Sequence, residues 1–222
     1  IAGIGWGLVQ KAVELDSGAM PDFTVPPPRS HSQHQVRVNG PLYAALAEEA
    51  VLAAGVKLAY YEFPLSVKQS GTGWLVDVVG KGQRRLVQCR QLIDCTGGAD
   101  VVGMIGLARL REATIQPGTM MFELDNYDVK KLDAKLIQQR YLKAIDAGEL
   151  QPGDWSHGEQ SFIGFLNARG SNAQHVFGAD SSTAATKTQA NIAGRQSALR
   201  MLRFLRSLPG CENARLMRMP QE

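Results

Sequence analysis

The residues with the clearest chemical use are Thr96, Gly97 and Gly98, which follow the stretch Leu92-Ile93-Asp94-Cys95. This order predicts a buried strand at Leu92–Ile93 that ends in a turn at Thr96. Glycine lets the backbone approach a ligand closely and permits positive φ. Since nucleotides bind at the carboxyl ends of strands in open α/β sheets, the turn is a candidate nucleotide contact. The alternative, that Thr96-Gly97-Gly98 is only a structural turn, stays open on these residues alone.

Other reactive side chains form no complete catalytic or metal-binding set in the sequence. Asp94 is a single carboxylate, and we expect it to hydrogen-bond locally, because acid/base catalysis needs a partner group. His31 and His34 have the spacing of half a metal site, but no carboxylate or cysteine accompanies them, which favours a solvated loop. We therefore predict no metal site and name no catalytic residue.

Three cysteines, Cys89, Cys95 and Cys211, form no Cys-x-x-Cys pair. Their odd number and the strand-like surroundings of Cys89 and Cys95 predict small buried hydrophobic side chains rather than a disulfide framework. A reducing compartment fits this pattern, so we predict a cytoplasmic protein.

Composition narrows the class of protein further. Of the 222 residues, 44% are hydrophobic and 20% are charged, which is typical of a globular protein with a real core. The net charge of +3 is too small to indicate nucleic-acid binding. No apolar run approaches the roughly 20 residues that span a bilayer, so a membrane span is not expected. A small molecule remains the expected partner.

The first half of the chain predicts helices and an antiparallel ribbon. An apolar pattern predicts an opening helix over Trp6–Leu15, and Pro26-Pro27-Pro28 predicts an extended linker after it. Pro41–Ala54 has a proline in its first turn and Gly55 as its stop, which indicates a second helix. We then expect a strand at Val56–Tyr60 and a ribbon formed by Trp74–Val79 and Leu86–Cys89.

The second half begins with Gln116-Pro117-Gly118-Thr119 and an apolar strand. Apolar periodicity predicts a helix over Val129–Ala147, and Phe162–Leu166 is expected to be another strand. A closing helix begins at Ser182 or Thr183 and runs to Leu208. Its packed face has the helical spacing i, i+3, i+4, i+7 and consists of Met201, Phe204, Leu205 and Leu208.

This order of helix, strand, ribbon, strand and Thr-Gly turn resembles the later part of the flavin domain in FAD-dependent oxidoreductases of the glutathione-reductase-like fold. The resemblance implies that Thr96, Gly97 and Gly98 contact the cofactor. It also places Glu62–Val67 where these proteins touch the adenine ring. Pro64 has no N–H to donate there, so either the adenine contact shifts by a residue or it uses only a carbonyl.

Two further segments are similar to the same family. Gln116-Pro117-Gly118-Thr119 resembles the crossing from the flavin domain into the substrate domain. Gly194-Arg195 and the later Pro209-Gly210-Cys211-Glu212-Asn213-Ala214 resemble the family's Gly-Arg helix and Pro-Gly-aromatic-Glu-Asn-Ala segment, with Cys211 replacing the aromatic residue.

The resemblance implies an α/β (α+β overall) fold, with part of a Rossmann-like FAD-binding domain over residues 1–106 and part of a substrate domain over residues 107–222. It implies FAD as cofactor and hydride or electron transfer to or from a small-molecule substrate. The nearest glycine cluster, Gly3-Ile4-Gly5-Trp6-Gly7, lacks the Gly-x-Gly-x-x-Gly spacing that binds pyrophosphate. We therefore expect an internal fragment that retains FAD poorly by itself.

Two other functions are compatible with parts of the pattern. A non-enzymatic α+β binding module would explain the missing phosphate motif and make the Thr-Gly-Gly turn purely structural. An NAD-dependent dehydrogenase would need the glycine fingerprint, which the sequence lacks.

Overall fold

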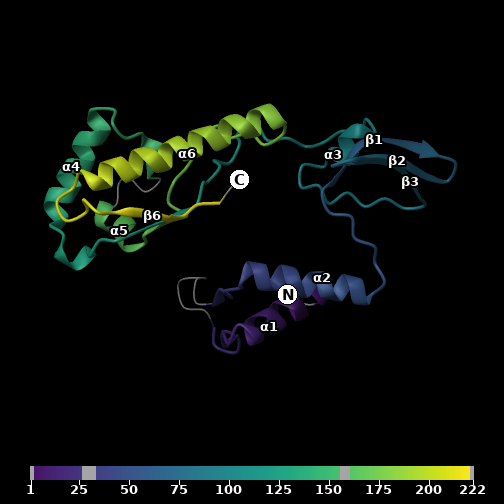
Figure 1. Cartoon of the computed structure of the whole chain (residues 1–222), viewed down its shortest axis with the longest axis horizontal. Coiled ribbons are helices and arrows are strands. Elements are labelled where there is room, and N and C mark those ends of the chain that lie inside the picture. The colour runs from purple at the N-terminus through teal and green to yellow at the C-terminus, as the bar shows by residue number, and fades with distance from the viewer. Residues whose placement is uncertain (1–2, 27–33, 156–160, 221–222) are drawn as a thin grey trace. The chain divides into compact units, whose positions relative to one another are not determined.

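The computed structural model of the chain describes residues 3–26, 34–155 and 161–220 (Figure 1). It is a mixed α/β structure with small antiparallel sheets, which confirms the predicted α+β class. Contacts divide the chain into two compact units, Ile1–Asp94 and Cys95–Glu222, and each is described by itself. The predicted domain boundary at residue 106 stays a prediction.

Two helices that contact each other begin the first unit. They are α1 (Ile4–Leu15) and α2 (Gly40–Ala53), which confirms both predicted helices to within two residues. The side chain of Asn39 caps α2 by accepting the N–H of Leu42 at 3.3 Å. Gly55, at φ +76°, follows the helix end.

Three antiparallel strands form the ribbon, in the order β1-β2-β3 (Figure 1). They are β1 (Glu62–Ser70), β2 (Gly73–Gly80) and β3 (Gln83–Cys89). The ribbon predicted from Trp74–Val79 and Leu86–Cys89 is confirmed, and β1 adds a third strand. Val67, Val76 and Val87 pair across the three strands, and the first two are buried.

Two predicted strands are wrong. Val56–Tyr60 is irregular, and Leu92–Ile93 forms no strand before Thr96, with Ile93 83% exposed. A strand needs a hydrogen-bonded neighbour. In the described part of the chain neither has a paired strand. Cys95 is exposed in the same irregular segment, contrary to its predicted burial.

The second unit contains the remaining elements, ordered as α3 (Asp100–Met104), β4 (Phe122–Asp125), η2 (Val129–Lys131), α4 (Ala134–Asp146), η3 (Pro152–Asp154), α5 (Phe162–Asn167), β5 (Gly170–Ser171), α6 (Ala184–Arg206) and β6 (Arg215–Arg218). The second sheet has the order β5-β4-β6. The closing helix is confirmed as α6, which Thr183 caps. The helix predicted from Val129 begins instead at Ala134, because the Asp133 side chain accepts the N–H groups of Lys135 and Leu136.

The predicted strand Phe162–Leu166 is also wrong, since these residues lie in α5. A helix brings Phe162, Phe165 and Leu166 to one face, and all three are at most 1% exposed. A strand would have sent Phe162 and Phe165 to opposite faces. The helix therefore buries both aromatic rings, which stack with their centroids 5.1 Å apart.

An ion pair with a buried carboxylate links η3 to α6. Asp154 is 1% exposed and accepts two hydrogen bonds from the Arg200 guanidinium, at 3.0 and 2.7 Å. The Ser197 hydroxyl donates to the same carboxylate at 2.5 Å, and the Gln151 N–H donates at 2.8 Å. The charge is thus paired and hydrogen-bonded, as burial requires.

Some predictions fall on residues outside the description, including Pro27, Pro28 and His31. His34 is described, and its ring packs against Phe23 with centroids 5.4 Å apart.

Among the described residues no group of three or more His, Cys, Asp or Glu side chains gathers as a metal site would require. None of the helices in the described ranges is long and apolar enough to cross a membrane.

Candidate functional site

The predicted contact residues Thr96, Gly97 and Gly98 form one exposed turn before α3. The Thr96 hydroxyl oxygen accepts the N–H of Asp100 at 2.8 Å, which closes the turn. Gly97 has φ +81°, in the left-handed region that glycine adopts most readily. Ala99, the residue before α3, is left-handed as well, at φ +52°. The turn therefore presents mainly backbone to the solvent.

The space beside Gly97 is open. A Cβ atom built on this residue would meet no other atom within 4 Å. A side chain would consequently fill space that a ligand against the turn could use. Gly82, in the ribbon turn between β2 and β3, has nearly the same geometry, with φ +76° and no atom within 4 Å of its Cβ position. It provides a matched turn that carries no binding prediction.

Arg109 contacts the turn and the beginning of α3 through its guanidinium. Its guanidinium donates to the Gly98 carbonyl at 3.3 Å and lies 3.7 Å from the Asp100 carboxylate. Gly103 of α3 leaves room for this group, since a Cβ there would lie 2.7 Å from Arg109 Cζ. The Asp100 carboxylate offsets the charge of the guanidinium, so the pair braces the turn without giving it a net charge.

Pro64, the fourth predicted contact, lies in the first unit. It is half-buried in β1 opposite Val78, where the strand register shifts between Pro64 and Ser66. The structure thus brings Thr96, Gly97 and Gly98 together in one turn of the second unit, whereas Pro64 belongs to the sheet of the first unit.

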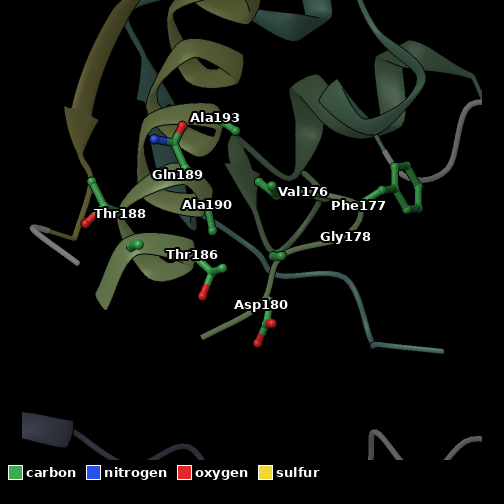
Figure 2. A pocket seen from close by; sticks show the side chains of 11 residues that line it. Val176, Phe177, Gly178, Asp180, Thr186, Thr188, Gln189, Ala190 and Ala193 are labelled. Atoms are coloured by element: carbon green, nitrogen blue, oxygen red, sulfur yellow. The ribbon is translucent and has the colours of Figure 1, made fainter. Parts of the chain in front are cut away.

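A pocket of about 480 Å³ lies at the beginning of α6 (Figure 2). Residues 176–180 form one wall, and the early turns of α6 form the other. The α6 wall includes Ala185, Gln189, Ala190 and Ala193. This volume is within the range of small-molecule sites, which are mostly apolar with a few placed polar groups.

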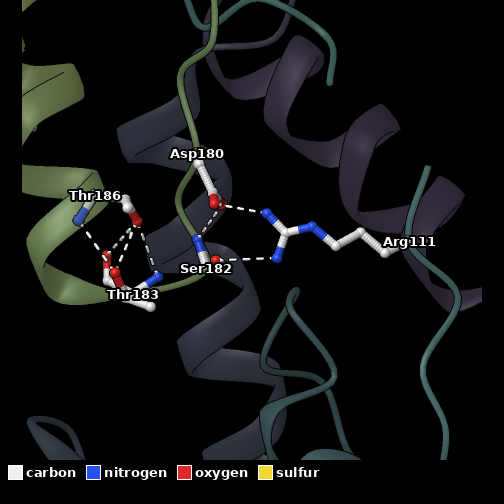
Figure 3. A network of polar contacts seen from close by, with 5 residues as sticks. All are labelled: Arg111, Asp180, Ser182, Thr183 and Thr186. Carbon is white, nitrogen blue, oxygen red and sulfur yellow. Dashed lines mark hydrogen bonds and ion pairs between the residues drawn. The ribbon is translucent and has the colours of Figure 1, made fainter. Parts of the chain in front are cut away.

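Polar contacts fix the edge of this pocket (Figure 3). Arg111 donates to the Asp180 carboxylate at 2.6 Å and to the Ser182 hydroxyl at 3.3 Å. The Ser182 N–H donates to the other carboxylate oxygen at 2.9 Å. The hydrogen bond from this N–H, then the Ser182 hydroxyl and Arg111, hold the pKa of Asp180 below its ordinary value. The carboxylate is therefore charged at neutral pH, and Arg111 offsets its charge.

The first turn of α6 is capped by reciprocal hydrogen bonds. The Thr183 hydroxyl accepts the Thr186 N–H at 3.1 Å, and the Thr186 hydroxyl accepts the Thr183 N–H at 3.2 Å. These bonds satisfy two donors that a helix start leaves open. They also hold the pocket wall in place.

Sequence reasoning did not identify the pocket or its ion pair. The sequence predicted the beginning of α6 at Ser182 or Thr183. It did not predict the ion pair, because Arg111 and Asp180 are 69 residues apart in the chain. Neither residue has a local pattern that indicates the other. The small side chains of Ala185, Ala190 and Ala193 are equally typical of any helix, so no signal in the sequence distinguished this wall.

One comparison with known proteins gives a match. The family model described as FAD dependent oxidoreductase matches residues 1–222, the whole chain. No curated protein and no solved structure matches the chain significantly.

Proposed function

The chain belongs to the FAD dependent oxidoreductase family, and on this premise we propose that it transfers a hydride or electrons through FAD to or from a small-molecule substrate. The family supplies the flavin-dependent redox role. The direction of transfer and the kind of substrate are our proposal. Its cytoplasmic location stays a prediction from the cysteine pattern.

We place the cofactor contact at Thr96, Gly97 and Gly98, with Pro64 as a second contact through its carbonyl. The observation that carries this assignment is the open, left-handed turn at Gly97, beside which a side chain would occupy free space. The two successive glycines leave the backbone uncovered by side chains, which suits a large planar ligand that must approach the backbone closely. The residues present therefore fit the cofactor.

Each residue of the turn has a distinct part in this proposal. The Thr96 hydroxyl holds the turn closed through Asp100 N–H. Gly97 leaves the space for the ligand. Arg109 donates to the Gly98 carbonyl and so holds the end of the turn, while the Asp100 carboxylate offsets its charge. FAD, when bound, supplies the redox chemistry, while the protein binds and orients it.

A non-enzymatic binding module is the second candidate function. The pocket at the beginning of α6 agrees with it, because a pocket of that size can bind a ligand without a flavin. The family match favours the oxidoreductase.

The test is the visible spectrum of the complete protein after reconstitution with FAD and desalting. We expect an oxidised-flavin spectrum that bleaches when a reductant is added anaerobically. A panel of small-molecule reductants then identifies the substrate class by the rate of bleaching. A folded protein that retains no flavin after reconstitution would contradict the proposal and leave the binding module.

A further inference from the structure

The pocket at the beginning of α6 has features that specify a ligand without reference to the flavin. Its walls are formed largely by apolar and small side chains, including Val176, Ala179, Ala190 and Ala193. In Figure 2 the Phe177 ring points away from α6, and it is 65% exposed. Phe177 therefore does not fill the space between the walls.

The charged groups at the edge of the pocket are already matched. Asp180, whose side chain is 24% exposed, pairs with Arg111 and also accepts the Ser182 N–H. A cationic ligand would have to displace Arg111. An anionic ligand would be repelled by the Asp180 carboxylate without gaining an unpaired cation from these lining residues. Both charged forms would also lose hydration against the apolar walls.

One polar side chain in the pocket lining remains available. The Thr186 hydroxyl is used in the helix cap, and the Thr188 hydroxyl donates to the Ala184 carbonyl at 2.7 Å. The Gln189 amide makes no hydrogen bond within the described ranges. An amide offers both a donor and an acceptor without a net charge.

We propose that this pocket binds an uncharged, mainly apolar small molecule that carries a hydroxyl or carbonyl group, which hydrogen-bonds to Gln189. The apolar walls supply most of the affinity, and the amide selects the polar group. The neutralised Arg111–Asp180 pair discriminates against charged analogues. The proposal is independent of the flavin contact, since none of its residues belongs to the Thr96–Gly98 turn.

Three probes that share one ring system test the charge preference. They are 1-naphthalenemethanol, 1-naphthylmethylammonium and 1-naphthoate, measured with the complete protein by equilibrium dialysis. The dissociation constant of the alcohol should be at least about fivefold lower than that of either ion. Arg111→Met leaves Asp180 without its partner, so the ammonium should gain affinity relative to the alcohol. Equal binding of all three probes to the natural protein would overturn the proposal.

A second arm locates the binding. Ala190→Trp fills the pocket and should reduce binding of the alcohol about tenfold. Ala184→Trp makes the same substitution on an exposed position of α6 outside the pocket lining, and should leave binding unchanged. Ala190→Leu is a milder filling variant if the tryptophan disturbs folding, which circular dichroism reveals. If binding to Ala190→Trp and Ala190→Leu equals that of Ala184→Trp, the probe binds elsewhere and the proposal fails.

Discussion

At the scale of single residues, the hydroxyl of Thr96 links the turn to α3. It accepts the Asp100 N–H at 2.8 Å, while Gly97 supplies the left-handed backbone. The turn residues were predicted from sequence because Thr-Gly-Gly has a local conformational meaning. Arg109 was not predicted from sequence, because its contact with Gly98 depends on how the chain folds back after α3.

We expect Thr96→Val to loosen this turn, because valine keeps the shape but cannot accept the Asp100 N–H. The variant should lose about 1 kcal/mol in unfolding free energy and retain less flavin than the natural protein. Thr96→Ser keeps the acceptor and should therefore have the stability and the flavin retention of the natural protein. Urea denaturation and flavin content after desalting measure the two effects. Unchanged flavin retention in Thr96→Val would show that the hydroxyl has no part in holding the cofactor contact.

Tyr127 gives the structure a specific alkaline sensitivity. Its hydroxyl donates to the Leu166 carbonyl at 3.0 Å, and burial raises the pKa of Tyr127 from 10.0 to about 12. Because the pKa is raised in the folded state, the stabilisation is fully present below pH 10. It is lost as the pH rises towards 12, where the unfolded chain ionises first.

Tyr127→Phe should therefore be less stable than the natural protein at neutral pH, where the hydrogen bond is lost. It should also show a smaller decline in unfolding free energy between pH 10 and pH 12. Denaturant titrations at several pH values in this window compare the slopes. Parallel slopes for the two proteins would contradict the assignment.

At the scale of elements, local signals succeeded for helices and failed for strands without neighbours. The capping Asn39 and the stop at Gly55 delimit α2, and α6 begins at its Thr183 cap. By contrast, Val56–Tyr60 and Leu92–Ile93 have strand-like composition but no paired strand in the described part of the chain. Strand formation depends on partners that local sequence does not specify. Phe162–Leu166 was misassigned for a related reason, since short apolar runs have no distinguishing period.

The attachment of η3 to α6 depends on the buried Asp154. Asp154→Ala should destabilise the second unit by about 3 kcal/mol, because the buried Ser197 hydroxyl and the Arg200 guanidinium, whose side chain is 25% exposed, lose their partner. The control is Glu123→Ala, which removes an exposed ion pair with Arg218 at 3.3 Å and should cost less than about 1 kcal/mol. Thermal or urea unfolding compares the two variants. Equal losses would show that burial of the Asp154 pair has little energetic weight.

At the scale of the whole molecule, the two units bury very different amounts of apolar surface. The main hydrophobic cluster comprises residues between Phe122 and Ala214, all in the second unit. In the described part of the first unit the buried apolar residues are Ala12, Val13, Val67 and Val76. Composition predicted a globular protein with a core, but it could not divide that core between units. This division depends on contacts between residues far apart in sequence, such as Asp154 with Arg200.

The family assignment concerns the chain as a whole, and the central claim that we add to it is the proposed cofactor contact at Gly97. Gly97 and Gly82 have almost the same backbone geometry, with φ +81° and +76° and open space around both Cβ positions. Valine at either position should therefore cost a similar amount of stability, about 1 kcal/mol or more. Any difference in cofactor binding between the two variants then reflects the ligand and not the strain.

The most direct measurement is the flavin content of Gly97→Val and Gly82→Val in the complete protein, beside the unfolding midpoint of each apo-protein. We predict that Gly97→Val loses its flavin, that Gly82→Val retains it, and that the two midpoints agree closely. If both variants bind FAD as the natural protein does, or if flavin and stability fall together in both, the Thr96–Gly98 turn does not contact the cofactor.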